Sequence, residues 1–422
     1  MKVLFIFGGM PNYLRDFLEK LNQTQNLEVF VVIPEKKSKT IGSGVFEDLQ
    51  ASCSFQILHT QEFLLLGQKP ALKNLFQIIK SISPQIVVVG WPYILGLYLN
   101  VKLKIWLKKN NIKVFYRSIP YQLPPYQEAL QFYTHQGFFD ENMNHIKADT
   151  LFKKIKYWLI TQINRSYFRW VDGHLNYCTQ ALEILPTYGV PKEKIFVTYN
   201  SIDTDKILEA KIAIQNKESI LPPNPLRIIH VGRLVKWKKI DMLLEVFARV
   251  IQKFPTAELI LIGDGIEMQN LQKLAHNLQI HTKVKFLGAI HQTQILGKYF
   301  SESLFCVLVG AGGLVINEAM AWGKPVICSE ADGTEKDLII HQKTGLFFEK
   351  DNPTDLQAKI EYLLQNPEIA KEMGKNAEEF IFSHINIHTV VKNFVNAFNA
   401  VTANQYQLRY EPQTYSYSRS QT

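Results

Sequence analysis

Two cations stand on one stretch of the sequence directly after an apolar run. The stretch HVGRLVKWK contains Arg233 and Lys238, five positions apart, and it follows the apolar residues RIIHV. Two cations on one loop can neutralise a diphosphate, because a guanidinium binds two phosphate oxygens at once and an ammonium acts as a point charge. The chemistry that these residues favour is the binding of a diphosphate group. The alternative interpretation is a solvated basic loop.

A second stretch, VGAGGLVINEAMAWGKPV, has Gly310, Gly312 and Gly313 directly before an apolar run that carries one acid, Glu318. The spacing predicts a helix after the glycines, and the N-terminus of a helix presents unpaired N–H groups and a positive dipole end. Glycines let a ligand approach that backbone closely. The loop is therefore predicted to contact a phosphate, with Glu318 placed to accept hydrogen bonds from a ribose diol. A glycine-rich structural turn would have the same pattern.

Rigid elements must bring these stretches together, and the sequence predicts two sets of strands. The predicted strands are KVLFIF, LEVFVVIP, QIVVVG, KVFYRS, GHLNYC and IFVTYN in the first half, and RIIHVG, AELILIG, VKFLG, LFCVLVG, PVICSE and GLFFE in the second. Continuous apolar runs are typical of strands that are buried on both faces of a parallel sheet, and helical spacing fills the gaps between them. This alternation predicts an α/β fold with two doubly wound parallel-sheet domains that face each other across a cleft.

The composition also suggests where the domains begin and end. We expect an N-terminal domain over residues 1–203, a polar, proline-rich linker over 204–224 and a C-terminal domain over 225–385. A helical stretch follows over 386–402. The tail over 403–422 has few aliphatic residues and is expected to be disordered.

Length and residue usage narrow the class of protein. A chain of 422 residues favours two domains over one. The four scattered cysteines favour a reducing compartment over a disulfide framework, so we expect a cytoplasmic protein. No run of about 18 apolar residues is present, which argues against a membrane-spanning helix. No cluster of histidines and cysteines has metal-ligand spacing, so no metal site is expected.

The net charge of +9 is concentrated in the first half of the chain, since residues 1–203 hold 23 lysines and arginines against 15 acids. Two stretches there, 102–117 and 153–169, contain basic residues and no acid, and aromatic residues interleave the second. They are either solvated helix faces or a surface that docks on anionic lipid or a phosphorylated acceptor. No recognised nucleic-acid motif accompanies the charge, so nucleic acid is not expected as a partner.

The motifs together carry a resemblance. VGRLVKWKK, IGDGIEMQNL, VKFLG and GGLVINEAMAWGKPVI, in this order and spacing, resemble the C-terminal domain of the family-four glycosyltransferases of the GT-B fold. YNSIDTDKI resembles the segment that closes that family's N-terminal domain, and KVLFIFGGM is similar to its first strand and glycine turn. The resemblance is strong over 225–350 and weak between 35 and 190. It implies two Rossmann-like domains and a last helix, 386–402, that crosses back onto the N-terminal domain.

By this resemblance the protein is a retaining, hexosyltransferase-type enzyme that uses no metal or other cofactor. Its substrate is a nucleotide-diphosphate sugar, with UDP or GDP as the nucleotide. The acceptor is a glycan, a lipid-linked group or another hydroxyl, and the pathway makes cell-surface polysaccharide or glycolipid. With the basic stretches, this implies peripheral contact with anionic lipid at the inner membrane face.

The resemblance also assigns residues. Arg233 and Lys238 are the catalytic residues, which hold the donor diphosphate, and Glu318 holds the ribose. The other residues that it implies near the donor are Gly232, Gly310, Gly312, Gly313 and Leu314. On the acceptor side it implies Gly9, Arg117 and Ser118.

Two departures from the family pattern bear on activity. The family usually has a glutamate eight positions before the one that matches Glu318, and Gly310 stands there, which predicts a gap and a missing charge beside the sugar. A histidine near the transferred sugar is replaced by Arg117 and Ser118. These departures favour an alternative, a catalytically degenerate partner that binds nucleotide or glycan, while the retained Arg233, Lys238 and Glu318 favour the enzyme. A sugar-nucleotide epimerase shares the architecture, but the motifs are those of transferases.

Overall fold

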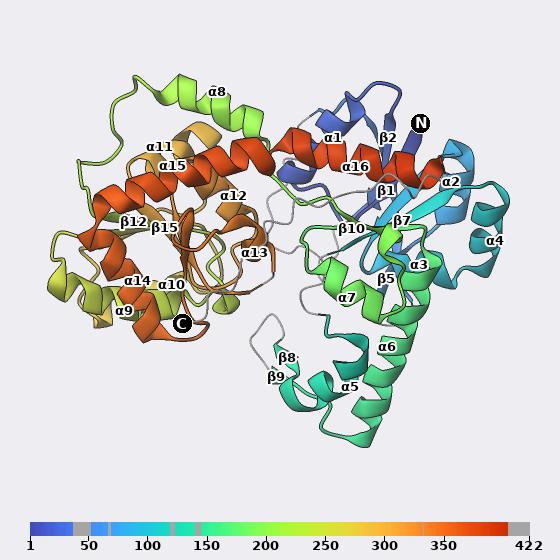
Figure 1. The fold of residues 1–422 in the computed structure, drawn as a ribbon, viewed down its shortest axis with the longest axis horizontal. Helices are drawn as coiled ribbons and strands as arrows, with labels where there is room; N and C mark the ends of the chain where they lie inside the picture. Colours follow the sequence, from blue (N-terminus) through green and yellow to red (C-terminus); the bar gives the residue numbers. More distant parts are fainter. Residues whose placement is uncertain (37–51, 66–68, 119–122, 140–144, 332, 404–422) are drawn as a thin grey trace.

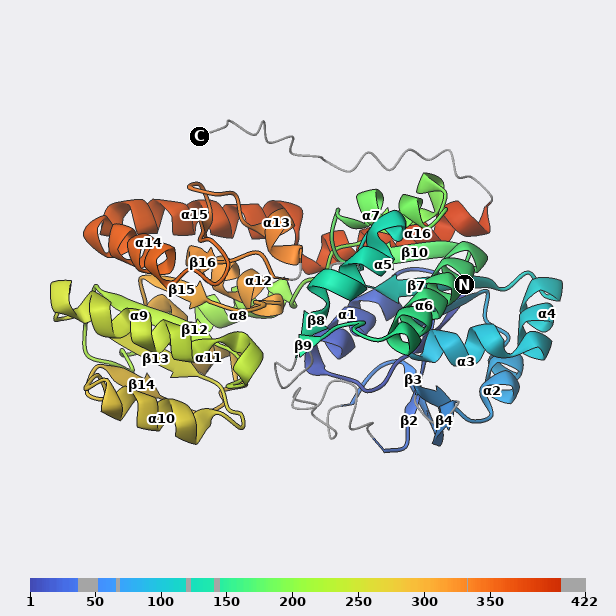
Figure 2. The ribbon, with the colours of Figure 1, turned by 90° about the horizontal axis from the view of Figure 1, so that it is seen from below.

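The computed structural model describes residues 1–36, 52–65, 69–118, 123–139, 145–331 and 333–403 of the chain. Each half of the chain folds around its own parallel sheet, and helices cover both faces of each sheet (Figures 1 and 2). The prediction of two doubly wound α/β domains is confirmed.

The N-terminal sheet has the strand order β11-β10-β7-β6-β1-β2-β3, with all neighbours parallel. The strands are β1 (Lys2–Ile6), β2 (Glu28–Pro34), β3 (Gln56–Thr60), β6 (Ile86–Gly90), β7 (Lys113–Ser118), β10 (Gly173–Asn176) and β11 (Ile195–Val197). The chain leaves β1 in one direction for β2 and returns on its other side for β6. The loops after β1 and β6 therefore diverge at this switch point, the position at which open α/β sheets bind ligands.

Helices and two small hairpins surround this sheet. The helices are α1 (Asn12–Asn22), α2 (Leu75–Ile82), α3 (Tyr93–Leu99), α4 (Val101–Lys109), η2 (Tyr126–Glu128), α5 (Ala129–Gln131), η3 (Phe132–Gln136), α6 (Leu151–Trp170), α7 (Ala181–Thr187) and η4 (Lys192–Lys194). The hairpins pair β4 (Glu62–Leu65) with β5 (Lys69–Leu72) and β8 (Phe138–Phe139) with β9 (His145–Ile146). Among the described residues, no helix is both long and apolar enough to span a bilayer.

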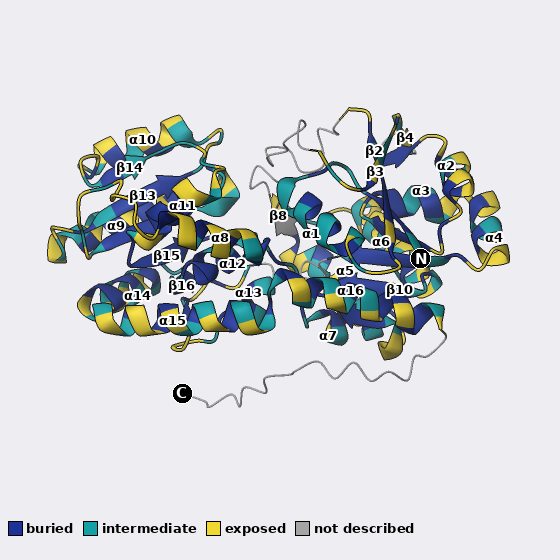
Figure 3. Cartoon of the chain, turned by 90° about the horizontal axis from the view of Figure 1, so that it is seen from above, coloured by how far each residue is buried: buried dark blue, intermediate teal, exposed yellow. Residues whose placement is uncertain are grey.

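The C-terminal sheet repeats this topology with the order β14-β13-β12-β15-β16-β17. Its strands are β12 (Arg227–Val231), β13 (Glu258–Ile262), β14 (Val284–Phe286), β15 (Phe305–Leu308), β16 (Val326–Cys328) and β17 (Gly345–Phe347). Each lies within an apolar run that was predicted as a strand. The sequence marks them clearly because both faces of this sheet are buried (Figure 3).

The helices of this domain have apolar faces that pack on the sheet. They are η5 (Lys236–Lys238), α9 (Ile240–Lys253), α10 (Met268–Asn277), α11 (Thr293–Ser301), α12 (Leu314–Ala321), α13 (Thr334–Leu338), α14 (Pro353–Gln365) and α15 (Pro367–His384). In α9, for example, Leu243, Phe247 and Val250 are fully buried at spacings of four and three residues. Burial of such a face is what holds the helix on the sheet.

Helix α8 (Thr204–Ile214) occupies the first part of the range that was expected to be a linker. Asp203 caps it, since its Oδ1 accepts the N–H of Asp205 at 3.1 Å. The apolar residues Ile207, Ala210 and Ile214 recur three and four positions apart and pack into the C-terminal core. The helix forms because that apolar face is buried, a contact that composition alone does not reveal.

Helix α16 (Ile387–Thr402) leaves the C-terminal domain and lies against α1 (Figure 1). Its ring of Phe394 lies 4.6 Å from that of Phe17, and Phe398 lies 5.3 Å from Phe115. Where the chain crosses, the hydroxyl of Ser201 donates to the carbonyl oxygen of Ile385 at 2.9 Å. The N-terminal core is thus completed by the last helix. The tail that was expected to be disordered lies, apart from its first residue, outside the described residues.

Candidate active site

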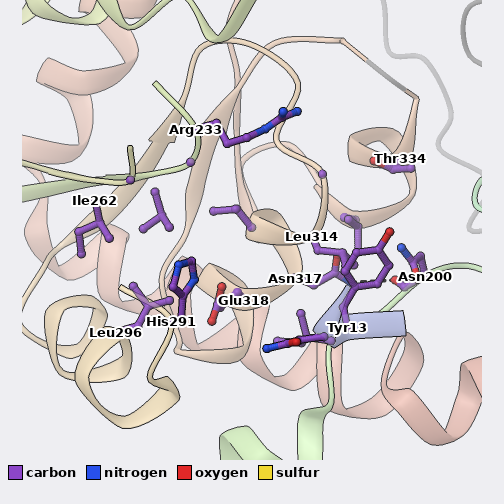
Figure 4. A pocket seen from close by; sticks show the side chains of 18 of the residues that line it. Tyr13, Asn200, Arg233, Ile262, His291, Leu296, Leu314, Asn317, Glu318 and Thr334 are labelled. Atoms are coloured by element: carbon purple, nitrogen blue, oxygen red, sulfur yellow. Dashed lines mark hydrogen bonds between the residues drawn. The ribbon is translucent and has the colours of Figure 1, made fainter. Parts of the chain in front are cut away.

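A pocket of about 890 Å³ lies between the two domains, at the carboxyl ends of their strands (Figure 4). Residues from both sheets line it. Of the predicted site residues, it brings together Gly232, Arg233, Lys238, Gly313, Leu314 and Glu318. The volume and the two-sided lining are typical of a small-molecule site at a domain interface.

The first wall is the loop after β12. The N–H of Gly232 donates to the carbonyl oxygen of Ile262 at 2.9 Å, which ties this loop to the loop after β13. The two loops pack backbone to backbone, since a Cβ on Gly263 would overlap the carbonyl group of Gly232. At both glycines φ is strongly positive, +154° and +144°. Only glycine permits this approach at this conformation.

Arg233 and Lys238 both lie against one aromatic ring, that of Trp237. The guanidinium carbon of Arg233 is 5.2 Å from the centre of the Trp237 ring, and the Nζ of Lys238 is 4.5 Å from it. A ring face attracts a cation and limits its motion. Trp237 therefore holds both cations on the pocket wall, a role that the sequence did not indicate.

The glycine-rich stretch after β15 touches this cationic loop directly. The Nζ of Lys238 donates to the carbonyl oxygen of Ala311. The backbone of Gly310 lies so close to the same loop that a Cβ there would be 2.8 Å from the Cα of Lys238 and still closer to the carbonyl oxygen of Trp237. The prediction of a gap at Gly310 is therefore wrong, because the backbone of the cationic loop fills that space.

The other glycines of this stretch have separate roles. Gly313 lines the pocket with φ +57° and is the residue from which α12 starts. Gly312 is buried against Ile316 and Leu308, where a Cβ would lie within 3 Å of both side chains. Neither Gly310 nor Gly312 is among the residues that line the pocket. They let the loop pack tightly, and Gly313 and Leu314 present its backbone to the pocket.

Glu318 lies on α12 and its side chain borders the pocket (Figure 4). The surrounding protein raises the pKa of Glu318 from its ordinary value of 4.5 to about 7. The cause is burial, which disfavours the charged form. The neighbouring Asn317 donates through its Nδ2 to the carbonyl oxygen of Asn200 at 3.2 Å, so that α12 also contacts the N-terminal domain.

The N-terminal domain supplies a third wall that sequence reasoning missed. Its lining residues come from the start of α1 and from the loops after β10 and β11; they are Asn12, Tyr13, Tyr177, Tyr199, Asn200 and Ile202. His291, which follows β14, also lines the pocket. The one feature that could have identified them in the sequence is their position, because all of them follow the carboxyl end of a strand. Polar and aromatic residue types alone did not separate them from ordinary loop residues.

A second contact joins the domains at the pocket. The carboxylate of Asp337 on α13 accepts the backbone N–H of Thr179 at 2.7 Å and its hydroxyl at 2.5 Å. Burial raises the pKa of Asp337, and the bonds from Thr179 oppose that rise. Asp337 itself lines the pocket. The domains are thus hydrogen-bonded to each other on both α12 and α13.

The residues expected on the acceptor side do not line the pocket. Arg117 is only 6% exposed, and its guanidinium lies among aromatic rings, 4.7 Å from that of Tyr177. Since Tyr177 lines the pocket, Arg117 lies one side chain behind its wall. The hydroxyl of Ser118 donates to the Oδ1 of Asn176 at 3.2 Å. Gly9 lies in the loop between β1 and α1. The contact of Gly9, Arg117 and Ser118 with an acceptor stays a prediction.

His230 ends β12 beside the site but belongs to the core. Its Nδ1 lies 2.8 Å from the carbonyl oxygen of Val307, to which it donates, and burial lowers its pKa to about 4. The ring is therefore neutral near pH 7. In the part of the chain that the structure describes, no group of three or more His, Cys, Asp or Glu side chains is placed to hold a metal ion.

The raised pKa of Glu318 predicts a pH-dependent effect on stability. Its folded pKa of about 7 exceeds its ordinary value of 4.5. The resulting stabilisation is complete below about pH 4.5 and is lost as pH rises through 7. Above that pH the charged carboxylate lowers the free energy of unfolding by about 1–3 kcal/mol, a range that allows for partial hydration of the group in the pocket. Glu318→Gln should therefore raise the free energy of unfolding at pH 8 and change it little at pH 5.

Urea denaturation at the two pH values measures this difference. Glu372→Gln, which removes an exposed acid on α15, is the matched control and should have the same small effect at both. If Glu318→Gln acts equally at pH 5 and pH 8, the carboxylate is not desolvated in the folded protein.

The sequence of this chain is similar to those of known glycosyltransferases. The family model "Glycosyl transferases group 1" matches residues 211–380. The chain is 28% identical over 204 residues to N-acetyl-alpha-D-glucosaminyl L-malate synthase of Bacillus anthracis, covering 48% of this chain and 53% of the relative. It is 24% identical over 372 residues to poly(ribitol-phosphate) alpha-N-acetylglucosaminyltransferase of Staphylococcus aureus, covering 81% and 71%. The chain spans about half the length of the first curated relatives that it matches.

A solved structure resembles the whole chain. It is that of Anabaena HepE in complex with UDP, with a TM-score of 0.63 and 15% sequence identity, covering 95% of this chain and 100% of the other. At this identity the likeness shows the fold alone. It extends over both sheets, including the N-terminal region that the family model does not match.

Proposed function

We propose that the chain, which matches the group 1 glycosyl transferases over residues 211–380 and has the GT-B fold, transfers a hexosyl group from a nucleotide-diphosphate sugar to a hydroxyl acceptor. The observation that carries the proposal is the pocket wall on which Arg233 and Lys238 both contact Trp237 beside the glycine-rich loop. Two cations held next to the backbone of a glycine-rich loop suit the binding of a diphosphate.

In this proposal the cationic loop stabilises the leaving group. The bond between the anomeric carbon and the diphosphate oxygen breaks, and Arg233 and Lys238 neutralise the charge that develops on the diphosphate. The acceptor hydroxyl attacks from the face that the diphosphate leaves and gives its proton to the departing phosphate oxygen. The new bond then has the configuration of the old one, and no metal or other cofactor takes part.

The remaining walls have complementary tasks in the proposal. Gly313 and Leu314 present backbone to the phosphate or the sugar, and Glu318 accepts hydrogen bonds from the ribose. The N-terminal wall with Tyr13 and Tyr177 faces the acceptor. Placing the two substrates on opposite walls of one pocket brings the acceptor hydroxyl to the anomeric carbon.

The relatives support a choice of donor and pathway to test first. HepE was solved with UDP, and two of the relatives named above are N-acetylglucosaminyl-transferring by name. We therefore propose a UDP-sugar as donor. The poly(ribitol-phosphate) relative supports a glycan or lipid-linked acceptor in cell-surface synthesis. Location in the cytoplasm, at the inner membrane face, belongs to this proposal.

Gly310 supports the alternative, a degenerate protein that binds nucleotide or glycan without turnover, because the family's usual glutamate is absent there. Incubation with a panel of UDP-, GDP- and ADP-sugars, followed by detection of released nucleoside diphosphate, separates the two. Release from one donor, absent in an Arg233→Ala, Lys238→Ala double variant, supports the transferase. Binding of a nucleotide without release from any donor would support the alternative.

Glu318 should act mainly on donor affinity. A hydrogen bond to a charged group is worth about 1.5–3 kcal/mol, so Glu318→Gln is expected to raise the donor KM about 10- to 100-fold with a smaller change in kcat. Because the ionised form is the better acceptor and its pKa is about 7, the wild-type donor KM should fall as pH rises through 7. Initial rates at pH 6 and pH 8 measure both effects. A donor KM that neither the substitution nor pH alters would assign Glu318 a structural role.

A further inference from the structure

The side of α6 that faces solvent is the apolar one. Phe152, Ile155, Leu159 and Ile163 are 77%, 50%, 47% and 43% exposed. They recur three and four positions apart, so they share one face of the helix. On the opposite face, Thr161 and Phe168 are buried against the N-terminal domain. A helix on the surface of a soluble domain normally has a polar outer face, so the outer face of α6 is unusual.

Basic residues flank this apolar stripe. Leu151 and Trp158 are also exposed and widen the stripe, and the exposed Lys154 and Lys156 lie at helix positions on either side of it. The segment from Thr150 to Val171 contains no acid. An apolar stripe with lysines along both edges is the pattern of helices that lie in the interface of a membrane.

Helix α4 extends the same surface. Val101 and Ile105, four positions apart, are both 64% exposed, and Lys102, Lys108 and Lys109 on the same helix are exposed as well. The helix pair α3–α4 touches the C-terminal end of α6. There the hydroxyl oxygens of Tyr98 and Ser166 are 2.5 Å apart, and the Nζ of Lys104 lies 5.3 Å from the Trp170 ring. The helical parts of the two acid-free stretches thus lie near each other on the outer side of the N-terminal domain (Figure 1), and we call their exposed faces the α4–α6 surface.

We propose that the α4–α6 surface docks on a lipid bilayer that contains anionic lipids. The apolar side chains enter the boundary between headgroups and acyl chains, and the lysines contact lipid phosphates. A helix of 20 residues is about 30 Å long, enough to lie along the interface over its whole stripe. Charge decides against a second copy of the chain as occupant, because two such surfaces would set lysines against lysines with no acid in either stretch to pair them.

This inference does not depend on the transferase function, and vesicle binding measured without any substrate tests it. The full-length protein is sedimented with vesicles of pure phosphatidylcholine and with vesicles of equimolar phosphatidylcholine and phosphatidylglycerol. Binding to the anionic vesicles alone, decreasing with added salt, is expected. Equal binding to both, or binding to neither, would overturn the proposal.

Two sets of substitutions separate the apolar from the electrostatic contribution. Lys154→Glu with Lys156→Glu should lower the partition coefficient at least about 25-fold, because each basic residue near an anionic surface contributes a factor of about five. Ile155→Gln with Leu159→Gln should lower it by about the same factor through lost apolar insertion. The matched controls are Lys273→Glu with Lys375→Glu, and Ile212→Gln with Ile266→Gln, which change exposed residues on other elements and should bind as wild type.

Trp158, which is 50% exposed on α6, reports insertion directly. Brominated lipids in the anionic vesicles should quench part of the protein's tryptophan fluorescence, and Trp158→Phe should abolish most of that quenching. Sedimentation velocity without lipid tests the second copy as occupant. A dimer that the Ile155→Gln, Leu159→Gln variant dissociates, together with quenching that Trp158→Phe leaves unchanged, would contradict membrane docking and assign the surface to self-association.

Discussion

Replacing Arg233 or Lys238 by alanine is expected to lower turnover about 100- to 1000-fold while the fold survives, by analogy with the loss of one oxyanion-hole donor. Both side chains line the pocket, and neither belongs to the hydrophobic core. The loss should appear in kcat, because the charge that they stabilise is greatest as the diphosphate leaves. Arg233→Lys should fall between wild type and Arg233→Ala, since lysine keeps the charge and loses the planar fork.

Lys236→Ala is the matched control. It lies on the same short helix, η5, but is exposed and lines a separate hollow, not the main pocket. Initial rates with a saturating donor, together with thermal unfolding of each variant, separate lost catalysis from lost stability. Rates close to wild type in both alanine variants would mean that the cationic loop does not stabilise a leaving group.

A side chain at Gly310 is expected to lower turnover by at least about 100-fold, an effect comparable to removing one of the cations whose loop it would displace. A Cβ there would stand 2.8 Å from the Cα of Lys238. Gly310→Ala should therefore displace η5 and, with it, the cation that contacts Ala311. Gly310→Glu adds a negative charge beside a diphosphate and should be at least as harmful. Overpacking of this kind costs about 1–3 kcal/mol of stability, which a domain of this size survives.

Gly90→Ala, at the end of β6, serves as the control, because a Cβ there meets only the carbonyl oxygen of Arg117 at 3.8 Å. It should keep wild-type activity. Donor hydrolysis and transfer, measured for wild type and for Gly310→Glu, distinguish a loop that supports activity with a glycine from one in a protein that has lost its activity. A Gly310→Glu variant more active than the wild type would show that the glycine marks the loss of an ancestral function.

The C-terminal domain was the more predictable half because its strands are buried on both faces. Runs such as those around Ile228 and Leu261 are continuously apolar and end in glycines, which marks both the strand and the loop after it. Strand β3 was not predicted, since it is an edge strand whose residues Gln56 and His59 are exposed. Its pattern does not differ from that of a loop.

The candidate site was predictable where a residue type has a distinct chemical use. The cations and Glu318 have one, but the space around Gly310 does not, because it depends on how closely two loops pack. The N-terminal wall was missed for a similar reason. Tyr177 and Asn200 reach the pocket only through the relative placement of two domains, which α16 and the crossing at Ser201 determine. No local pattern in the sequence encodes that placement.

The central claim is that the pocket between the domains is a nucleoside-diphosphate site. Isothermal titration of UDP, GDP and ADP into the full-length protein, without any acceptor, tests it most directly. We predict that one of the three, UDP first, binds with a one-to-one stoichiometry, and that Arg233→Ala and Glu318→Gln each weaken this binding while Lys236→Ala does not. Absence of binding by all three nucleotides, or binding that the pocket substitutions leave unchanged, would contradict the claim.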